Sequence, residues 1–401
     1  MRNKKICALW LCIVALCVTA IGAVGLWRVP NLLQYAIPAP TETQPSSAGG
    51  EEGKAEEAKS ALYGLIESWE TQRETLAENL SASAISAFAY GQSFSAEAGG
   101  SGSGTLTGVG VGWFDVYPRF LLEGRLIGEA ELREGANVVV LDEPLAFAIF
   151  QGAEAVGSQL QIGGIWYEVI GVVRHTRQVG DTDAMGAYVP IQRLAQDFVQ
   201  MDVVTLSGVP IPATGATTFF TEAAGNWRSG GDFYDLSKEG MRAGMIVRLL
   251  VVLFAMAVLL FLLKRLLRRV GAGVREWRAR LKVEYFRSMM RQVFGSAALW
   301  LLGLAAILGA AFALLSLLIE PLYVFTEWVP EVIVEWSSLE ARFWELTTAM
   351  AKPVKVQTAE YARVCFFGTL LRWGVISALC AVILNLAHRL RARRQIGRAH
   401  V

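Results

Sequence analysis

The fold is decided by a stretch that reads LQIGGIWYEVIGVV between residues 160 and 173. It contains two runs of apolar and β-branched residues, and only Gly163-Gly164 separates them. A connection of two glycines between such runs is typical of a β-hairpin, because glycine adopts the backbone angles that a tight turn requires. We therefore expect strands at residues 159–162 and 166–173.

The segments around this hairpin predict further short strands and helices. Strands are expected at residues 137–141, 187–191 and 203–206, and helices at residues 144–150 and 217–227. Residues 55–80 place one apolar face at helical spacing, which predicts an amphipathic helix. That face consists of Leu62, Leu65, Ile66, Trp69 and Leu76. The mixture predicts a compact α+β domain, and the absence of any GxxxxGKS or GxxxxGKT phosphate loop argues against a nucleotide-binding domain.

Two stretches of turn-forming residues indicate flexible connections. Residues 38–54 are rich in Pro, Ser, Thr, Gly and Glu, and residues 99–104 consist only of Gly and Ser and are expected to form a loop. We therefore assign residues 28–54 to a linker. The folded domain is expected to occupy residues 55–242.

Four long apolar runs flank this domain in the sequence. They lie at residues 6–27, 243–263, 293–319 and 364–387. A helix that crosses a bilayer needs roughly 20 such residues, and four runs of this length are too many for one soluble core. We therefore expect a membrane protein with four transmembrane α-helices. The first run exceeds the roughly 7–15 apolar residues of a signal peptide, which favours a retained anchor.

Charge sets the expected orientation of these helices. The 28–242 segment carries 27 acidic and 13 basic residues, whereas the 264–292 loop carries 10 basic and 2 acidic ones. The N-terminus and the tail at 388–401 are basic, and the 320–363 loop is acidic. Because cytoplasmic loops carry the excess of Lys and Arg, we expect both termini and the 264–292 loop in the cytoplasm. The large α+β domain is then extracytoplasmic and inserted between helices 1 and 2.

Further landmarks accompany the hairpin in a fixed order. They are Glu123-Gly124-Arg125, VVVLDEPLA at residues 138–146, the hairpin itself, and YVPI at residues 188–191. In order and spacing they resemble the extracytoplasmic core of the MacB/FtsX-like permeases of ABC transporters. One span, a large outer domain and three further spans is also the layout of that family.

The resemblance implies the permease subunit of an ABC transporter in a bacterial cytoplasmic (inner) membrane. Such a subunit transmits ATP-driven motion to its extracytoplasmic domain, which acts on a peptide, lipid, drug or cell-wall enzyme. The implied partners are a separate ABC ATPase that binds the ATP, and a second permease in a homodimer or heterodimer. No cofactor and no nucleic acid partner is expected for the chain itself. The alternative is a stand-alone membrane-anchored sensor or scaffold whose outer domain binds a ligand.

An enzyme is not expected, because the sequence offers no catalytic constellation. Its three histidines, His175, His388 and His400, are isolated from one another in the sequence. They show no metal-ligand spacing, and one outer histidine cannot complete a Ser/His/Asp set. All five cysteines lie inside the apolar runs, so the exported domain is expected to contain no disulfide.

The 264–292 loop departs from the family pattern. Members carry a segment like EIGIRRALGA that docks on the ATPase, whereas residues 273–292 read GVREWRARLKVEYFRSMMRQ. Apolar residues recur four positions apart here, so they share one helix face with basic residues around it. The candidate ATPase contacts are Arg275, Trp277, Arg278, Leu281, Lys282 and Tyr285. The alternative is that this face lies on the lipid headgroups of the membrane.

One charge falls well inside an apolar run. Arg372 lies eight residues into the fourth run, about 12 Å deep at 1.5 Å per residue. Intramembrane charges are costly and often functional, so we consider a pairing with Glu320 or with another subunit.

Two segments near the C-terminus complete the expectations. Residues 326–350 place apolar side chains at helical spacing, which predicts an amphipathic helix in the 320–363 loop. This helix would lie at the membrane interface or pack under the outer domain. The last six residues, 396–401, read IGRAHV, which matches a translated sequencing adapter, and we treat them as a processing scar.

Overall fold

The computed structural model describes residues 2–398 except for several short ranges. The ranges left out are 40–50, 98, 153, 175–177, 181–184, 197–200, 213, 283–285, 325–339, 342–343 and 346–353. The chain divides into two units, and each is described by itself. The domain unit comprises residues 17–241 and 353–370, and the helical unit comprises residues 1–16, 242–352 and 371–401.

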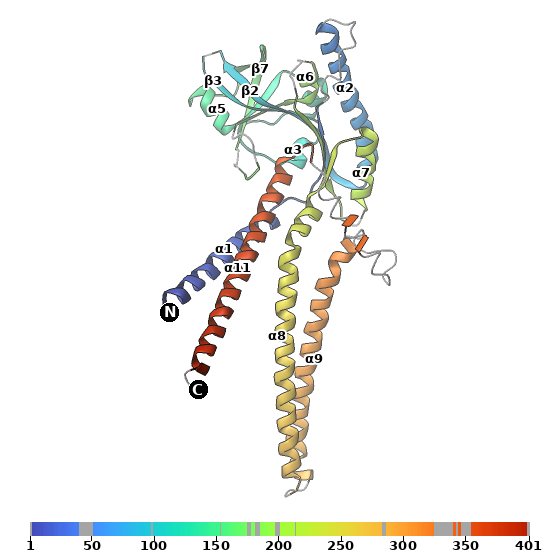
Figure 1. Ribbon diagram of the computed structural model, residues 1–401. Coiled ribbons are helices and arrows are strands. Elements are labelled where there is room, and N and C mark those ends of the chain that lie inside the picture. Colours follow the sequence, from blue (N-terminus) through green and yellow to red (C-terminus); the bar gives the residue numbers. More distant parts are fainter. Residues whose placement is uncertain are drawn as a thin grey trace. The chain divides into compact units, whose positions relative to one another are not determined.

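Ten strands and ten helices are described (Figure 1). The strands are β1 (Leu33–Pro38), β2 (Leu80–Ala96), β3 (Ser101–Val109), β4 (Phe120–Gly124), β5 (Val138–Asp142), β6 (Gln159–Ile162), β7 (Ile165–Arg174), β8 (Gly186–Pro190), β9 (Val203–Pro210) and β10 (Asp232–Asp235). The helices are α1 (Arg2–Trp27), α2 (Glu51–Leu76), α3 (Trp113–Val116), α4 (Glu129–Glu134), α5 (Glu143–Phe150), α6 (Ile191–Gln196), α7 (Ala216–Trp227), α8 (Leu236–Arg280), α9 (Phe286–Val324) and α11 (Ala359–Arg398).

All ten strands belong to one mixed sheet in the domain unit. Its order is β10-β1-β9-β2-β3-β8-β5-β7-β4, and β6 pairs with both β2 and β7. Through β6 the pairing closes a circuit of six strands, β2, β3, β8, β5, β7 and β6. One hydrophobic cluster draws on all six of these strands and on α5, with Phe94, Leu106 and Tyr167 among its buried members. The circuit therefore encloses a core of its own, and β9, β1 and β10 extend the sheet on the other side of β2.

The hairpin at the centre of the sequence argument is confirmed. β6 and β7 pair antiparallel, and Ile162 lies opposite Ile165. Gly163 and Gly164 both have positive φ angles, of 57° and 88°, which a side chain would disfavour. The expected strands at 137–141, 187–191 and 203–206 are also present, as β5, β8 and the first half of β9.

The start of the folded domain differs from the expectation. Residues 28–54 were assigned to a linker, but β1 lies inside them and pairs with β9 on one side and β10 on the other. Its first five residues are buried, so both faces of the strand belong to the core. The domain therefore begins before residue 55, and a fragment of residues 55–242 would lack an inner strand of the sheet.

A second difference concerns the segment between α2 and α3. Residues 101–104 of the expected Gly/Ser loop form the start of β3, which pairs with β2 in a long hairpin. The small residues have a packing reason: a Cβ at Gly102 would lie 3.1 Å from Leu145, and one at Gly104 would lie 2.5 Å from the carbonyl oxygen of Met185. Glycine occurs at these two positions because neighbouring atoms approach the strand closely there, and not because the segment is a flexible loop.

The amphipathic helix is confirmed as α2, although its last residue is Leu76 and Leu80 begins β2. All five residues of the expected apolar face are buried. They pack with α7 in a cluster where Trp69 lies edge-on to Phe220, with ring centroids 6.4 Å apart. The same cluster includes Leu33 and Ile37 of β1, so α2 and α7 cover one face of the β1-β9 part of the sheet.

Three helices among the described residues are long and apolar enough to cross a membrane. These candidate spans are Val247–Arg280, Val293–Leu317 and Ala359–Ile383. The first apolar run appears as α1, of which Ile13–Trp27 is recorded as a shorter apolar helix. The expected basic loop at 264–292 is largely helical instead, because α8 continues to Arg280 and α9 begins at Phe286.

In the helical unit, α8 and α9 lie side by side (Figure 1). The Trp277 ring of α8 stacks on the Trp300 ring of α9, with centroids 4.6 Å apart. A Cβ at Gly273 would lie 2.5 Å from the same Trp300 ring, so the absence of a side chain at residue 273 leaves room for the indole. The two helices therefore form an antiparallel hairpin that extends beyond the apolar run of α8.

We predict that replacing Ile170 with Asp will strongly destabilise the domain. Ile170 is only 6% exposed in β7, and an unpaired carboxylate there costs several kcal/mol of unfolding free energy. Thermal unfolding of the full chain in detergent, followed by tryptophan fluorescence, measures the effect. Gln159→Asp on the exposed side of β6 is the matched control and should change stability by only about 0.5 kcal/mol. Equal midpoints for the two variants would contradict the packing of β7.

Candidate functional site: the junction between α11 and the sheet

The start of α11 is built into the exported domain. Before the helix begins, the backbone N–H groups of Lys355 and Val356 donate to one carboxylate oxygen of Asp232 in β10, at 2.6 and 2.9 Å. The Tyr234 hydroxyl donates to the Val356 carbonyl oxygen at 2.5 Å. The ring of Tyr234 also lies on that of Tyr361, with centroids 4.4 Å apart. Strand β10 thereby holds the chain that leads into α11.

A buried amide makes the second connection. Gln34 of β1 is 1% exposed, and its Oε1 accepts a hydrogen bond from the Thr358 hydroxyl at 2.7 Å. Its Nε2 donates to the Tyr117 hydroxyl at 2.8 Å and to the Glu360 carboxylate at 2.9 Å. Tyr117 in turn shares a hydrogen bond of 2.9 Å with Ser207 of β9. The network therefore joins β1, β9, the residue after α3 and the first turn of α11.

Helix α8 is joined to the same edge of the sheet without any intervening loop. Asp235 ends β10 and is followed directly by the first residue of α8, Leu236. One carboxylate oxygen of Asp235 accepts from the Lys238 N–H at 3.0 Å, which caps the helix, and the other accepts from the Thr217 hydroxyl at 3.2 Å. The Leu236 N–H donates to the Leu32 carbonyl oxygen, which precedes β1. Both α8 and α11 thus leave the domain through short, hydrogen-bonded joints.

A small cavity of about 140 Å³ lies beside the Gln34 network. Its lining combines residues of the sheet and α3 with residues 357–360. Trp113, at the start of α3, packs against the rings of Tyr117 and Tyr188, both at 5.1 Å, and Arg119 lies over Trp113 and Tyr188. Among the described residues no group of three metal-ligating side chains gathers here or elsewhere.

Two tyrosines of the junction have raised pKa values. Burial is the main cause of the raised pKa of Tyr117, and the negative charge of Glu360 raises it further. Burial is also the main cause for Tyr234, with Asp232 adding to the effect. Both hydroxyls therefore keep their protons, which they need in order to donate within the junction.

The expected ATPase contacts fall on the far end of α8. The structure places Arg275, Trp277 and Arg278 on the helix and Leu281 and Lys282 directly after it, and Tyr285 lies outside the described residues. Trp277 does not share a free face with Leu281, because its ring is stacked on Trp300. The other four described side chains are exposed. Trp277 therefore packs within the α8–α9 hairpin, whereas the candidate contacts that remain exposed are Arg275, Arg278, Leu281 and Lys282, and their role stays a prediction.

Arg372 lies on the exposed side of α11. Glu320 is in α9, but its side chain is outside the described part of the structure, so the expected pairing between them stays a prediction. The amphipathic helix expected at 326–350 also falls almost wholly outside the described residues.

Sequence reasoning missed the junction itself. Its members are separated by up to 326 residues, and no local pattern links them. One signal was available: Gln34 is a lone amide inside a run of buried strand residues, and a buried amide requires hydrogen-bond partners.

We predict that Tyr117→Phe will make the unfolding free energy fall less steeply as the pH rises above about 10. The unfolded chain releases the Tyr117 proton near pH 10, whereas the folded chain holds it, so the unfolding free energy falls as the pH rises above about 10. Removing this group should reduce the slope by about 1.4 kcal/mol per pH unit. At neutral pH the variant should be less stable by about 1–3 kcal/mol, since Gln34 and Ser207 lose a partner.

Denaturant titrations of the full chain in detergent, at several pH values between about 8 and 11, measure both effects. The control is Tyr63→Phe, which removes a tyrosine hydroxyl on α2, away from the Gln34 network. A Tyr117→Phe slope equal to that of the unmodified protein would show that the hydroxyl is not protected by the junction.

Comparison with known proteins agrees with this architecture. The family described as the MacB-like periplasmic core domain matches residues 30–217, which begin just before β1 and end in α7. The match includes β1, in agreement with the structure and not with the expected domain start at residue 55. No sequence among curated proteins matches the chain.

Several solved structures show weaker similarity. The extracellular domain of the noncanonic ABC-type transporter YknZ from Gram-positive bacteria is 18% identical, with a TM-score of 0.35, and the match covers 50% of this chain and 99% of that one. The periplasmic region of MacB from Actinobacillus actinomycetemcomitans is 16% identical, with a TM-score of 0.36 and coverage of 52% and 90%. A domain of a putative permease from Porphyromonas gingivalis is 11% identical, with a TM-score of 0.30 and coverage of 39% and 76%.

The family match and the residue landmarks fall on the same strands. VVVLDEPLA forms β5 and the first turn of α5, and YVPI forms the end of β8 and the first residue of α6. Arg125 makes a two-pronged ion pair with Glu131 at 2.6 and 2.7 Å, which holds the start of α4. Residues 30–217 thus match the family described as the MacB-like periplasmic core domain.

Proposed function

We propose that this protein is the membrane subunit of an ABC transporter and transmits ATP-driven motion to its MacB-like domain. The observation that carries the proposal is the pair of rigid joints at β10 and β1, through which α8 and α11 enter the sheet. If a helix were joined to the sheet by a flexible loop, the loop would absorb the movement of the helix and the sheet would stay in place. A helix capped by a buried strand residue passes displacement on to the sheet.

The direction of transmission follows from the two ends of α8. At one end the helix is continuous with β10, and at the other it presents exposed basic side chains. The stack of Trp277 on Trp300 stiffens this second end by tying α8 to α9. A separate cytoplasmic ATPase that pushes on this hairpin would therefore move the edge of the sheet.

The proposal includes the membrane arrangement. The chain would cross a bacterial cytoplasmic membrane four times, with α1, α8, α9 and α11, both termini in the cytoplasm and the MacB-like domain inserted between the first two spans. Two permease subunits, identical or different, would act with two ATPases. The extracytoplasmic domain would then act on a peptide, lipid, drug or cell-wall enzyme.

We predict that tags at Gly50 and Glu345 will be accessible from outside the cell, and a tag at Arg275 only from the cytoplasm. The reason is the charge of the segments: 27 acidic against 13 basic residues in the 28–242 segment, and 10 basic against 2 acidic in the 264–292 segment. Labelling of intact and permeabilised cells with a membrane-impermeant reagent checks this. External labelling at Arg275 would overturn the orientation.

We further predict that Arg275→Glu/Arg278→Glu will abolish most co-purification of the ATPase. Both side chains are exposed on α8, and reversal of two charges at a contact should weaken binding by at least about tenfold. The measurement is the amount of ATP-binding protein retained by the tagged full chain from its native membranes. The matched control, Arg133→Glu/Arg228→Glu, reverses two charges in the MacB-like domain and should retain the ATPase.

A second variant, Leu281→Ser, tests in the same assay whether an apolar contact also contributes to ATPase binding. Leu281 is suitable because its side chain is 46% exposed and lies outside the Trp277–Trp300 stack. Trp277→Ser is unsuitable, since it would disturb the α8–α9 hairpin itself. Full retention of the ATPase by both the charge-reversed and the Leu281→Ser proteins would show that the end of α8 is not the coupling surface. Absence of any ATPase from the unmodified protein would favour the sensor or scaffold.

A further inference from the structure

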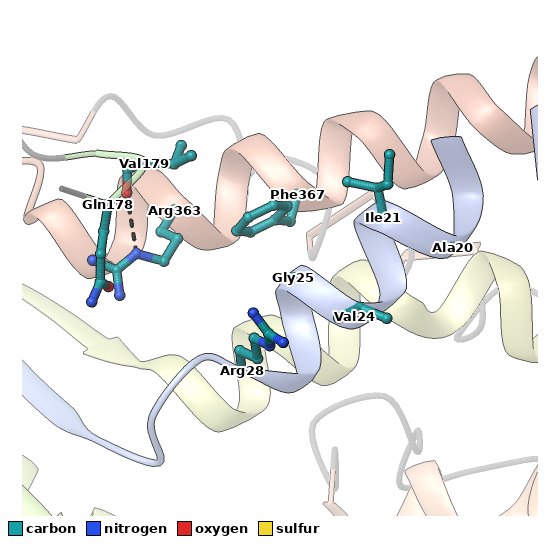
Figure 2. A pocket seen from close by; sticks show the side chains of 9 residues that line it. All are labelled: Ala20, Ile21, Val24, Gly25, Arg28, Gln178, Val179, Arg363 and Phe367. Atoms are coloured by element: carbon teal, nitrogen blue, oxygen red, sulfur yellow. Dashed lines mark hydrogen bonds between the residues drawn. The ribbon is translucent and has the colours of Figure 1, made fainter. Parts of the chain in front are cut away.

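The small cavity beside the Gln34 network differs from a larger cavity in the same domain unit. The larger one, of about 840 Å³, is lined by the last turns of α1 and the first turns of α11 (Figure 2). Its Arg363 is already engaged, because the Nε–H donates to the Val179 carbonyl oxygen at 3.1 Å (Figure 2). The small cavity, of about 140 Å³, instead has buried polar atoms in its lining that lack a partner within the described part of the chain.

The floor of the small cavity is the face of the sheet opposite α2 and α7. Val204 and Leu206 of β9 pack in the hydrophobic cluster that contains both helices. Because successive side chains of a strand point to opposite faces, Thr205 between them faces the other way. Thr205 lines the cavity there, and α3 and residues 357–360 provide the walls.

Three side chains of the lining have hydrogen-bond donors to spare. Trp113 is 3% exposed and Thr205 is 2% exposed, yet neither the indole Nε1–H nor the hydroxyl has a partner among the described residues. The Nε–H of Arg119 is buried and equally without one, while its guanidinium lies over the rings of Trp113 and Tyr188. We call Arg119, Trp113 and Thr205 the donor group. Buried polar groups normally have partners, so the donor group points to a bound molecule that supplies acceptors.

Arg119 and Glu360 bring opposite charges to the same cavity. One oxygen of Glu360 accepts from the Gln34 amide at 2.9 Å, but in the described part of the structure Glu360 forms no ion pair with Arg119. Both charges act on the Tyr117 hydroxyl. Burial is the main cause of its raised pKa, Glu360 raises the pKa further, and Arg119 lowers it. The cavity therefore offers a cation and an anion that are near one hydroxyl and are not neutralised by each other.

The volume limits what the cavity can hold. A cavity of about 150 Å³ in another protein binds benzene, which has six non-hydrogen atoms. A volume of about 140 Å³ is therefore suited to a molecule of that size. Sites for drug-sized ligands have volumes of roughly 300–1,000 Å³, so a drug or a lipid would not fit.

We propose that this cavity binds one small zwitterionic amino acid, with its carboxylate on the donor group and its ammonium on Glu360. A carboxylate supplies the missing acceptors, and a guanidinium binds it through paired hydrogen bonds. An anion alone would leave Glu360 without a cation, and a cation alone would lie against Arg119. Asp142, the second carboxylate of the lining, already accepts from the Tyr188 hydroxyl at 3.2 Å.

The site lies wholly within the domain unit. It therefore requires neither the proposed membrane arrangement nor an ATPase, and it goes beyond the proposed function. Since Glu360 belongs to the first turn of α11, the bound amino acid would connect that helix to Trp113 of α3 and Thr205 of β9.

Isothermal titration calorimetry of the purified full chain in detergent tests the proposal. The probes are L-alanine, acetate, ethylamine and L-leucine. L-Alanine should bind as a single molecule, and acetate and ethylamine, which each carry only one of its charges, at least about tenfold more weakly. L-Leucine should also bind more weakly, because it exceeds the volume. Acetate or ethylamine binding as tightly as L-alanine would overturn the proposal, and so would the absence of L-alanine binding, which would show that solvent alone fills the cavity.

Thr205→Val separates binding from folding. The change replaces a hydroxyl with a methyl group of similar size, and that hydroxyl has no partner among the described residues. The midpoint of thermal unfolding should therefore not fall, whereas L-alanine should bind about three- to tenfold more weakly. A lower midpoint together with unchanged binding would contradict the site.

Two further variants each remove one charge from the cavity. Arg119→Gln and Glu360→Gln should each weaken L-alanine binding at least about tenfold. The matched controls are Arg133→Gln and Glu129→Gln, which remove the same charges from an exposed ion pair on α4 and should leave binding unchanged. Unchanged binding by the Arg119, Glu360 and Thr205 variants would show that the amino acid binds elsewhere.

Discussion

The structure depends on the requirement that the buried amide of Gln34 be satisfied on all sides. An amide at 1% exposure that lost its partners would cost about 1–3 kcal/mol for each unpaired group. Its partners are Tyr117, which follows α3, and Thr358 and Glu360 at the start of α11, so they come from two parts of the chain that are far from Gln34 in the sequence. The sheet can therefore reach its lowest free energy only when the segment that leads into α11 is docked. One side chain thereby ties the start of α11 to the sheet.

This constraint explains why the chain needs so little loop between the sheet and its helices. Asp235 closes β10 and caps α8, and Asp232, three residues earlier, holds residues 355 and 356 ahead of α11. Both carboxylates lie on one four-residue strand at the edge of the sheet. Strand β10 is therefore the element where displacement of either helix would first be felt, and β1, which pairs with it, carries Gln34. This short edge strand thus holds the starts of both helices through its two carboxylates.

Local patterns predicted the parts of this fold that local physics determines. The Gly163-Gly164 hairpin, the buried strand β5 and the apolar face of α2 are all set by residues within one element. Strands β1 and β2 escaped prediction because their stability comes from partners. β1 is held by β9 and β10, and β2 is rich in Ser and Ala and pairs with β9 along its first half and with β3 along its second. The junction escaped for the same reason, since its hydrogen bonds join residues hundreds of positions apart. Trp277 looked like a free apolar side chain because helical spacing gives its face but not the neighbour, Trp300, that covers it.

The position of Arg372 within the apolar run of α11 bears on the proposed second permease subunit. It lies eight residues into the apolar run that begins at residue 364, about 12 Å along the helix and near the middle of a bilayer roughly 30 Å thick. In the single chain this side chain is exposed. A guanidinium at that depth is costly when it faces lipid, and its alkyl stem is too short to bring it to either surface without distortion of the bilayer. The exposure therefore supports the proposed assembly of two permeases, because a second subunit that covers this face of α11 would supply the polar group or water-filled space that the cation requires.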